Sequence, residues 1–260
     1  MRVALGIAYR GSGYRGWQSQ PGGSAVQDHV ERALSTFADK PIRSISAGRT
    51  DAGVHALNQV VHFDTDVVRR LDSWVRGTNR YLPDDIAVQW CRFVDDGFHS
   101  RASAIGRRYV YLLLEAPVRP AIETTLAGWT FRRLDGGAMQ RAAQALAGTH
   151  DFSAFRSAEC QAPSPVKTMR GLDIERRGAY WRFSFEADAF LHHMIRNVVG
   201  CLVAVGSGVR SERWLADVLA ARDRSQAAAT FAPDGLYFVG PYYDPVREIP
   251  DRTAAMDWLP

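Results

Sequence analysis

The order of the predicted strands and helices constrains the fold of this chain more than any other feature of its sequence. Residues 2–9 read as a strand, which a glycine-rich turn follows. Ser24-Ala25-Val26-Gln27 has the form of a capping box, and apolar residues then recur at helical spacing as far as Phe37, which predicts a helix over residues 25–38. The first half has the order β-α-β-β-α-β, because it continues with strands over 42–48 and 56–63, a helix over 71–78 and a strand over 86–94.

The second half of the chain repeats this order. A strand over 109–114 and a helix over 139–146 are followed by a hairpin that turns at Gly178. The remaining predicted elements are the hairpin strands over 169–176 and 180–185, helices over 190–206 and 211–221, and a last strand over 236–239.

Two β-α-β-β-α-β units predict an α+β fold made of two ferredoxin-like halves. We expect the halves to share an extended antiparallel sheet and to leave a central cleft between them. The expected domains are residues 1–104, residues 105–245 and a tail over residues 246–260.

Composition excludes several other classes of protein. Hydrophobic residues make up 46% and charged residues 23% of the 260 residues, which is typical of a globular protein and not of a disordered or coiled-coil chain. No stretch has the roughly 18 to 20 consecutive apolar residues that a membrane span needs, so we expect no membrane partner. The amino terminus is apolar only over residues 3–9, too short for a signal peptide. The three cysteines form no C-x-x-C pair, which argues against a disulfide framework and favours the reducing cytoplasm.

The formal charge is only +4, but every basic residue except Lys40 and Lys167 is an arginine. A compositional bias of the genome would explain this. Arginine forks also recognise phosphate groups through two parallel hydrogen bonds, so a phosphate-rich partner would explain it equally well. Composition alone leaves both explanations open.

Two motifs suggest cofactors but lack the context that cofactors require. Gly11-Ser12-Gly13-Tyr14-Arg15-Gly16 spells G-x-G-x-x-G after a strand, yet the next helix begins only near Ser24 and therefore cannot face a pyrophosphate. His192 and His193 are adjacent and lack the spacing of helical metal ligands. We therefore expect neither a cofactor nor a metal.

The segment Ala47-Gly48-Arg49-Thr50-Asp51-Ala52-Gly53-Val54-His55 is the strongest candidate for chemistry. Its Asp and Gly residues are also common in ordinary turns, which is the simpler interpretation. A simple hairpin does not require Arg49 two residues before Asp51, with glycines on both sides. An arginine within reach keeps an aspartate ionised in a partly dry site, so the segment is typical of a reactive carboxylate.

At this point the sequence closely resembles the tRNA pseudouridine synthase A family, over nearly the whole chain. The resemblance rests on motifs that occur in the same order, of which GRTDAGVHA over 48–56 is the most specific. The others are Gly16-Trp17-Gln18, Leu82-Pro83-Asp84-Asp85-Ile86, Phe98-His99-Ser100-Arg101, Arg107-Arg108-Tyr109-Val110-Tyr111, Phe190-Leu191-His192-His193-Met194-Ile195-Arg196-Asn197 and Gly235-Leu236-Tyr237.

The resemblance implies an isomerase that converts uridine to pseudouridine at positions 38, 39 and 40 in the anticodon stem-loop of tRNA. It also implies a homodimer that needs no cofactor, with tRNA and not DNA as its partner. By motif, Asp51 is the catalytic aspartate and Arg49 lies against the flipped nucleotide. Tyr109 packs under the target base, Arg196 pairs with Asp51, and Leu236 forms a wall of the base pocket.

The chemistry fits these residue types. The reaction breaks the bond between ribose C1′ and uracil N1 and rejoins the base through C5, with no net redox change, so no redox cofactor is required. A carboxylate can act covalently at the ribose or as a base on the sugar, and the sequence does not distinguish the two. Asp51 through water, or the Tyr109 hydroxyl, would then assist loss of the C5 proton.

The alternative function is a non-catalytic RNA-binding module, because RNA-recognition motifs also use a ferredoxin-like fold. Those modules carry an aromatic string of the form K/R-G-F/Y-G/A-F-V-x-F/Y, which this sequence lacks. The intact Asp51 favours the enzyme.

Overall fold

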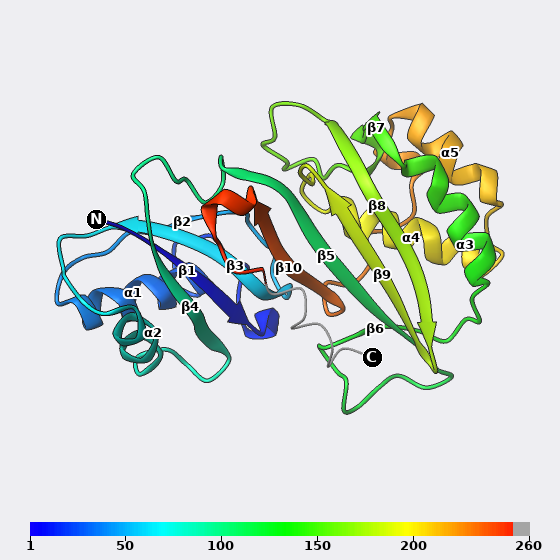
Figure 1. The fold of residues 1–260 in the computed structure, drawn as a ribbon. Helices are drawn as coiled ribbons and strands as arrows, with labels where there is room; N and C mark the ends of the chain where they lie inside the picture. Colours follow the sequence, from blue (N-terminus) through cyan, green and yellow to red (C-terminus); the bar gives the residue numbers. More distant parts are fainter. Residues whose placement is uncertain (252–260) are drawn as a thin grey trace. The chain divides into compact units, whose positions relative to one another are not determined.

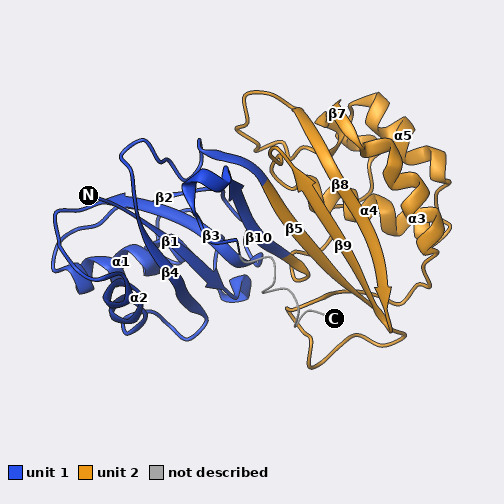
Figure 2. Ribbon diagram, viewed as in Figure 1, with its two compact units in different colours: residues 1–106, 237–259 blue, residues 107–236, 260 orange. Residues whose placement is uncertain are grey.

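The computed structural model describes residues 1–251, which form two compact units (Figures 1 and 2). Of the described residues, unit 1 contains Met1–Gly106 and residues 237–251, and unit 2 contains Arg107–Leu236. Both units combine helices with mostly antiparallel strands, so the predicted α+β class is confirmed. Most of the tail expected over 246–260 lies outside the described residues. Within residues 1–251, no helix has the length and apolarity that a membrane crossing requires.

Unit 1 is built on the strand order β4-β1-β3-β10, with the short strand β2 paired to β3. The central strand β1 runs antiparallel to both β3 and β4, whereas β10 runs parallel to β3. The strand predicted over 42–48 is reduced to the two residues of β2. The bounds are Arg2–Tyr9 for β1, Ile45–Ser46 for β2, His55–Asp64 for β3, Ile86–Val94 for β4 and Leu236–Tyr243 for β10.

Two helices cover the core of unit 1, α1 over Val26–Ala38 and α2 over Leu71–Asn79. Trp74 of α2 is fully buried and meets Phe37 of α1 and Phe63 of β3 edge to face, with ring centroids 5.3 and 5.4 Å apart. The predicted capping box at Ser24 shifts by one residue in the structure. The N-cap is Ala25, whose backbone N–H donates to the Asp28 carboxylate (3.0 Å), a favourable charge in the first turn of a helix.

Unit 2 has the strand order β5-β9-β8-β7, with β6 paired to β5. Burial alternates residue by residue along β9, so one face of the strand is covered. Helices α3, α4 and α5 pack with one another, and α3 also packs against β8 (Figure 1). The bounds are Ala104–Glu115 for β5, Gly128–Thr130 for β6, Gly148–Asp151 for β7, Val166–Arg177 for β8, Tyr180–Ala187 for β9, Gly136–Ala143 for α3, Met194–Gly206 for α4 and Glu212–Ala221 for α5.

The long helix predicted over 190–206 begins later, at Met194. The residue before it, His193, has a φ of 63°, a left-handed conformation that no helix continues through. Residues 190–193 therefore form a loop ahead of α4. The apolar residues on both sides of His192 and His193 gave no sign of this break.

The core of unit 1 contains a histidine that stays uncharged. His62 of β3 is 2% exposed, and its Nδ1 accepts a hydrogen bond from the backbone N–H of Ser100 (3.2 Å). Burial, helped by the nearby His99 and Arg2, lowers the pKa of His62 to about 4. The native state therefore takes up the proton only below the pH at which the unfolded chain does.

We expect this histidine to make the protein less stable in acid. The unfolded His62 gains its proton near pH 6.5 and the native one near pH 4, so stability is complete above pH 6.5 and falls as the pH drops between these values, by roughly 3 kcal/mol at most. The free energy of unfolding, measured by urea titration from pH 7 to 4, should fall more steeply for the parent than for His62→Gln. Parallel curves for the two proteins would contradict this.

Candidate active site

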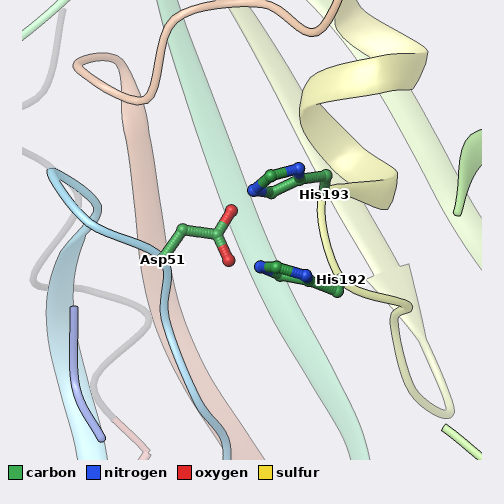
Figure 3. A group of neighbouring side chains, drawn as sticks. All are labelled: Asp51, His192 and His193. Carbon is green, nitrogen blue, oxygen red and sulfur yellow. The ribbon is translucent and has the colours of Figure 1, made fainter. Parts of the chain in front are cut away.

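Asp51 lies in the loop that joins β2 to β3. The backbone N–H of Val54 donates to the Asp51 carbonyl (3.2 Å), which closes a turn whose third residue, Gly53, has a φ of 83°. That turn needs a glycine, because other residues rarely adopt a positive φ. Asp51 is half-buried, and its carboxylate points away from its own loop (Figure 3). Arg49 is exposed. The turn thus presents the aspartate at the surface of unit 1.

The glycine-rich segment after β1 packs directly against this loop. A Cβ on Gly11 would stand 1.9 Å from the Val54 carbonyl oxygen, and one on Gly16 would stand 2.5 Å from the Thr50 oxygen. The segment also donates the N–H of Trp17 to the Thr50 carbonyl (3.1 Å) and accepts from Gly53 at the Tyr14 carbonyl (3.4 Å). Gly11 and Gly16, the outer glycines of the G-x-G-x-x-G sequence, therefore allow close backbone contact with the Asp51 loop.

Buried polar side chains form hydrogen bonds that hold the loop in place. The Tyr9 hydroxyl lies 2.7 Å from the Thr50 Oγ1, and the Gln59 Nε2 donates to the Gly48 carbonyl (2.7 Å). His55, the first residue of β3, accepts from the Gly11 N–H at Nδ1 (3.0 Å) and stacks on Tyr237 of β10 at 4.7 Å. No local sequence pattern marks Tyr9 or Gln59 as site residues, because each lies within a strand and its partner lies in another segment.

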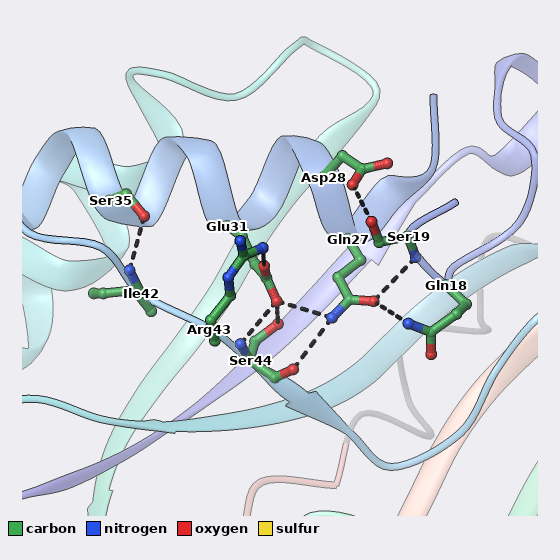
Figure 4. Close-up of polar contacts among 9 residues, drawn as sticks. All are labelled: Gln18, Ser19, Gln27, Asp28, Glu31, Ser35, Ile42, Arg43 and Ser44. Carbon is green, nitrogen blue, oxygen red and sulfur yellow. Dashed lines mark hydrogen bonds and ion pairs between the residues drawn. The ribbon is translucent and has the colours of Figure 1, made fainter. Parts of the chain in front are cut away.

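A polar network on α1 holds the chain that enters the loop (Figure 4). The Glu31 carboxylate is 8% exposed and accepts from the Ser44 N–H (2.8 Å), the Ser44 hydroxyl (3.0 Å) and Arg43 (2.8 Å). Gln27 accepts from Gln18 (2.9 Å) and the Ser19 N–H (3.1 Å), and donates to Glu31 (2.8 Å) and the Ser44 carbonyl (3.2 Å). The segments that lead from Gly16 and into β2 are thereby fastened to one helix.

The other predicted site residues lie in unit 2. Tyr109 of β5 is half-buried, pairs with Phe185 of β9 and meets Phe190 edge to face at 5.2 Å. Leu236, the first residue of β10, is 5% exposed, and its N–H donates to the Pro233 carbonyl (2.8 Å). Strand pairing thus fixes the backbone of Tyr109, and a backbone hydrogen bond fixes that of Leu236.

Arg196 lies in the first turn of α4. Its Nε donates to the Phe231 carbonyl (2.8 Å), and the Phe231 N–H donates back to the Arg196 carbonyl (3.2 Å). Arg196 is half-buried, so the apolar helix does not carry an unpaired buried charge. This contact joins α4 to the segment that leads into β10.

His192 and His193 stand in the loop before α4, with ring centroids 4.0 Å apart (Figure 3). The His192 N–H donates to the Cys160 Sγ (3.4 Å), and its carbonyl accepts from the Ser157 N–H (3.0 Å). That no metal binds here stays a prediction.

Comparisons with known proteins show which family contains these motifs. A family model described as tRNA pseudouridine synthase matches residues 142–244. The curated relatives include the tRNA pseudouridine synthase A of Methylibium petroleiphilum, 69% identical over 260 residues and over the full length of both chains. The chain belongs to the tRNA pseudouridine synthase A family. A protein of that name from Polaromonas naphthalenivorans is 62% identical, again over both full lengths.

Membership in the synthase family rests on both units. The family model covers Arg196 and Leu236, and the full-length relatives extend the likeness over the Asp51 loop. Among solved structures, a chain of a Cbf5-Nop10-Gar1 complex aligns with 12% identity and a TM-score of 0.37, over 77% of this chain and 45% of that one. A TM-score this low does not show a common fold.

The glycine contacts predict a difference between two neighbouring substitutions. Gly11→Ala forces a methyl group against the Val54 carbonyl and should destabilise the protein by about 1–3 kcal/mol, whereas a Cβ on Gly13 meets nothing within 4 Å. Gly13→Ala is therefore the matched control and should stay within about 0.5 kcal/mol of the parent. Calorimetric melting of the three proteins measures this, and equal melting temperatures would refute the close contact.

Proposed function

We propose that this chain isomerises uridine to pseudouridine at positions 38, 39 and 40 in the anticodon stem-loop of tRNA, with Asp51 as the catalytic carboxylate. The observation that carries the proposal is the Asp51 loop: a half-buried aspartate on a turn with fixed backbone contacts, in a chain of the tRNA pseudouridine synthase A family. The protein is an isomerase, because the base leaves and rejoins the same ribose.

Asp51 acts where the glycosidic bond breaks. The bond from ribose C1′ to uracil N1 is cleaved, the uracil turns, and C5 forms the new bond to C1′. The carboxylate serves either as a nucleophile at the ribose or as a base on the sugar. The proton on C5 leaves in the last step, through Asp51 and a water molecule or through the Tyr109 hydroxyl.

The remaining residues bind and orient the uridine in this proposal. A base in a stem must be extruded, which costs a few kcal/mol, and stacking on an aromatic ring such as Tyr109 recovers about 1–3 kcal/mol. Arg49 lies against the flipped nucleotide, and Leu236 forms an apolar wall of the base pocket. Arg196 pairs with Asp51 and keeps the carboxylate ionised.

The wider setting is part of the same proposal. Two ferredoxin-like halves, with a division near residues 104 and 105, share an extended antiparallel sheet and bind the anticodon stem-loop in the cleft that they form. The enzyme works as a homodimer in the cytoplasm, without a cofactor or metal. This setting extends the family likeness, and the arginine-rich composition fits a phosphate-rich substrate.

Asp51→Asn tests the function directly. The variant should lose turnover by at least about a thousandfold while its tRNA affinity stays within about twofold, because phosphate contacts supply most of the affinity. Release of tritium from [5-³H]uridine-labelled tRNA measures turnover, because each isomerisation expels the C5 hydrogen. Asp72→Asn removes the same charge from an exposed position on α2 and should behave like the parent. A parent that binds tRNA without releasing tritium would be a non-catalytic RNA-binding module instead.

Tyr109→Phe separates stacking from proton transfer. The ring and its edge contact with Phe190 remain, so tRNA affinity should be unchanged. If the hydroxyl assists loss of the C5 proton, tritium release should slow by about 100-fold or more while glycosidic cleavage continues. Rapid-quench measurements of both steps decide this, and equal tritium release in the two proteins would limit Tyr109 to stacking.

A further inference from the structure

The strongest feature that the proposed chemistry leaves unused is the hydroxyl pair beneath the Asp51 loop. Tyr9 is 4% exposed and Thr50 is 7% exposed, and their hydroxyl oxygens lie 2.7 Å apart. A buried hydroxyl that makes no hydrogen bond costs free energy, and a phenylalanine and a valine would fill the same space without that risk. The pair therefore specifies the position of the loop more than it fills the core.

Thr50 is the residue directly before Asp51, and two contacts fix it in place. Its side chain is tied to Tyr9 on β1, and its carbonyl accepts from the N–H of Trp17 (3.1 Å). The ring of Trp17, fully buried, also packs on the Tyr9 ring with centroids 5.8 Å apart. One residue is thus fixed at both its side chain and its carbonyl, directly before Asp51.

The loop is held equally firmly on either side of this point. Gln59 of β3 donates to the Gly48 carbonyl (2.7 Å), and the Asp51 carbonyl accepts from Val54 (3.2 Å). These contacts hold the loop at Gly48 and at Asp51, and the Tyr9–Thr50 hydrogen bond holds the side chain of the residue directly before Asp51. Burial raises the pKa of the Tyr9 phenol, so the hydroxyl remains protonated at any pH at which the enzyme would work.

We propose that Tyr9 and Thr50 are positioning residues that hold the Asp51 carboxylate in its reactive place. The proposal rests on the proposed function of Asp51 and assigns to the hydroxyl pair no contact with the substrate. A displacement of about 1 Å at a reacting group costs as much as 100-fold in rate, so loss of the anchor should slow the chemical step and spare substrate binding.

If the hydroxyl pair only stabilised the fold, any comparable loss of stability would lower the rate equally. Tyr243 provides a matched control for this. Tyr243 of β10 is 8% exposed, and its hydroxyl donates to the Ser100 carbonyl (2.7 Å). It is another buried tyrosine of unit 1 whose hydroxyl makes a strong hydrogen bond, and Ser100 lies outside the Asp51 loop. Tyr243→Phe therefore loses a comparable bond without loosening the loop.

The experiment compares Tyr9→Phe, Thr50→Val, Thr50→Ser and Tyr243→Phe with the parent, in the full chain. Three quantities are measured: the single-turnover rate of tritium release with enzyme in excess, the Kd for unmodified tRNA, and the melting temperature. Tyr9→Phe and Thr50→Val should slow the single-turnover rate by about 10- to 100-fold, with the Kd within twofold of the parent. Thr50→Ser keeps the hydroxyl and should recover most of the rate. Tyr243→Phe should lower the melting temperature by a similar amount and leave the rate unchanged.

Two results would overturn the proposal. Rates for Tyr9→Phe and Thr50→Val within twofold of the parent would show that the pair does not position Asp51. The second result is that Tyr243→Phe loses as much rate as Tyr9→Phe and Thr50→Val when all three have the same melting temperature. The effect would then be a general loosening of unit 1. Failure of the proposed function is distinct from both, because the parent itself would then release no tritium.

Discussion

The close approach of two backbone segments is the constraint on which the rest of unit 1 depends. The chain after β1 lies against the Asp51 loop so tightly that a methyl group on Gly11 or Gly16 would collide with a carbonyl oxygen of the loop. Residues without side chains are therefore required there. The contact fixes the connection between β2 and β3 and makes it a platform for Asp51, and it gives the glycine-rich segment after β1 a packing role.

The elements around the platform serve the same purpose. The network of Glu31 and Gln27 fastens the chain on both sides of it to α1, and His55 stacks on Tyr237 where β3 pairs with β10. The reaction proposed for Asp51 gains from fixed contacts of this kind, because orientation contributes a large part of the rate. In unit 2, the contact of Arg196 with Phe231 gives α4 and the chain entering β10 a common anchor.

Sequence patterns predicted the elements whose signals are local. The period of apolar residues gave α1, and the Asp51 loop could be identified from its motif. The partner of β10 could not be predicted, because pairing with β3 depends on contacts about 180 residues apart in sequence, which no local period encodes. The start of α4 depends on one left-handed residue, His193, and Tyr9 and Gln59 resemble ordinary strand residues until their partners are known.

Mapping of pseudouridine along one tRNA tests the central claim most directly. The substrate is an unmodified transcript with uridine at positions 38, 39 and 40 and at several positions outside the anticodon arm. The account predicts that the parent protein, without any added cofactor, converts uridine to pseudouridine at positions 38–40 and nowhere else. Conversion only outside the anticodon arm, or none at all with a transcript that the protein binds, would contradict it.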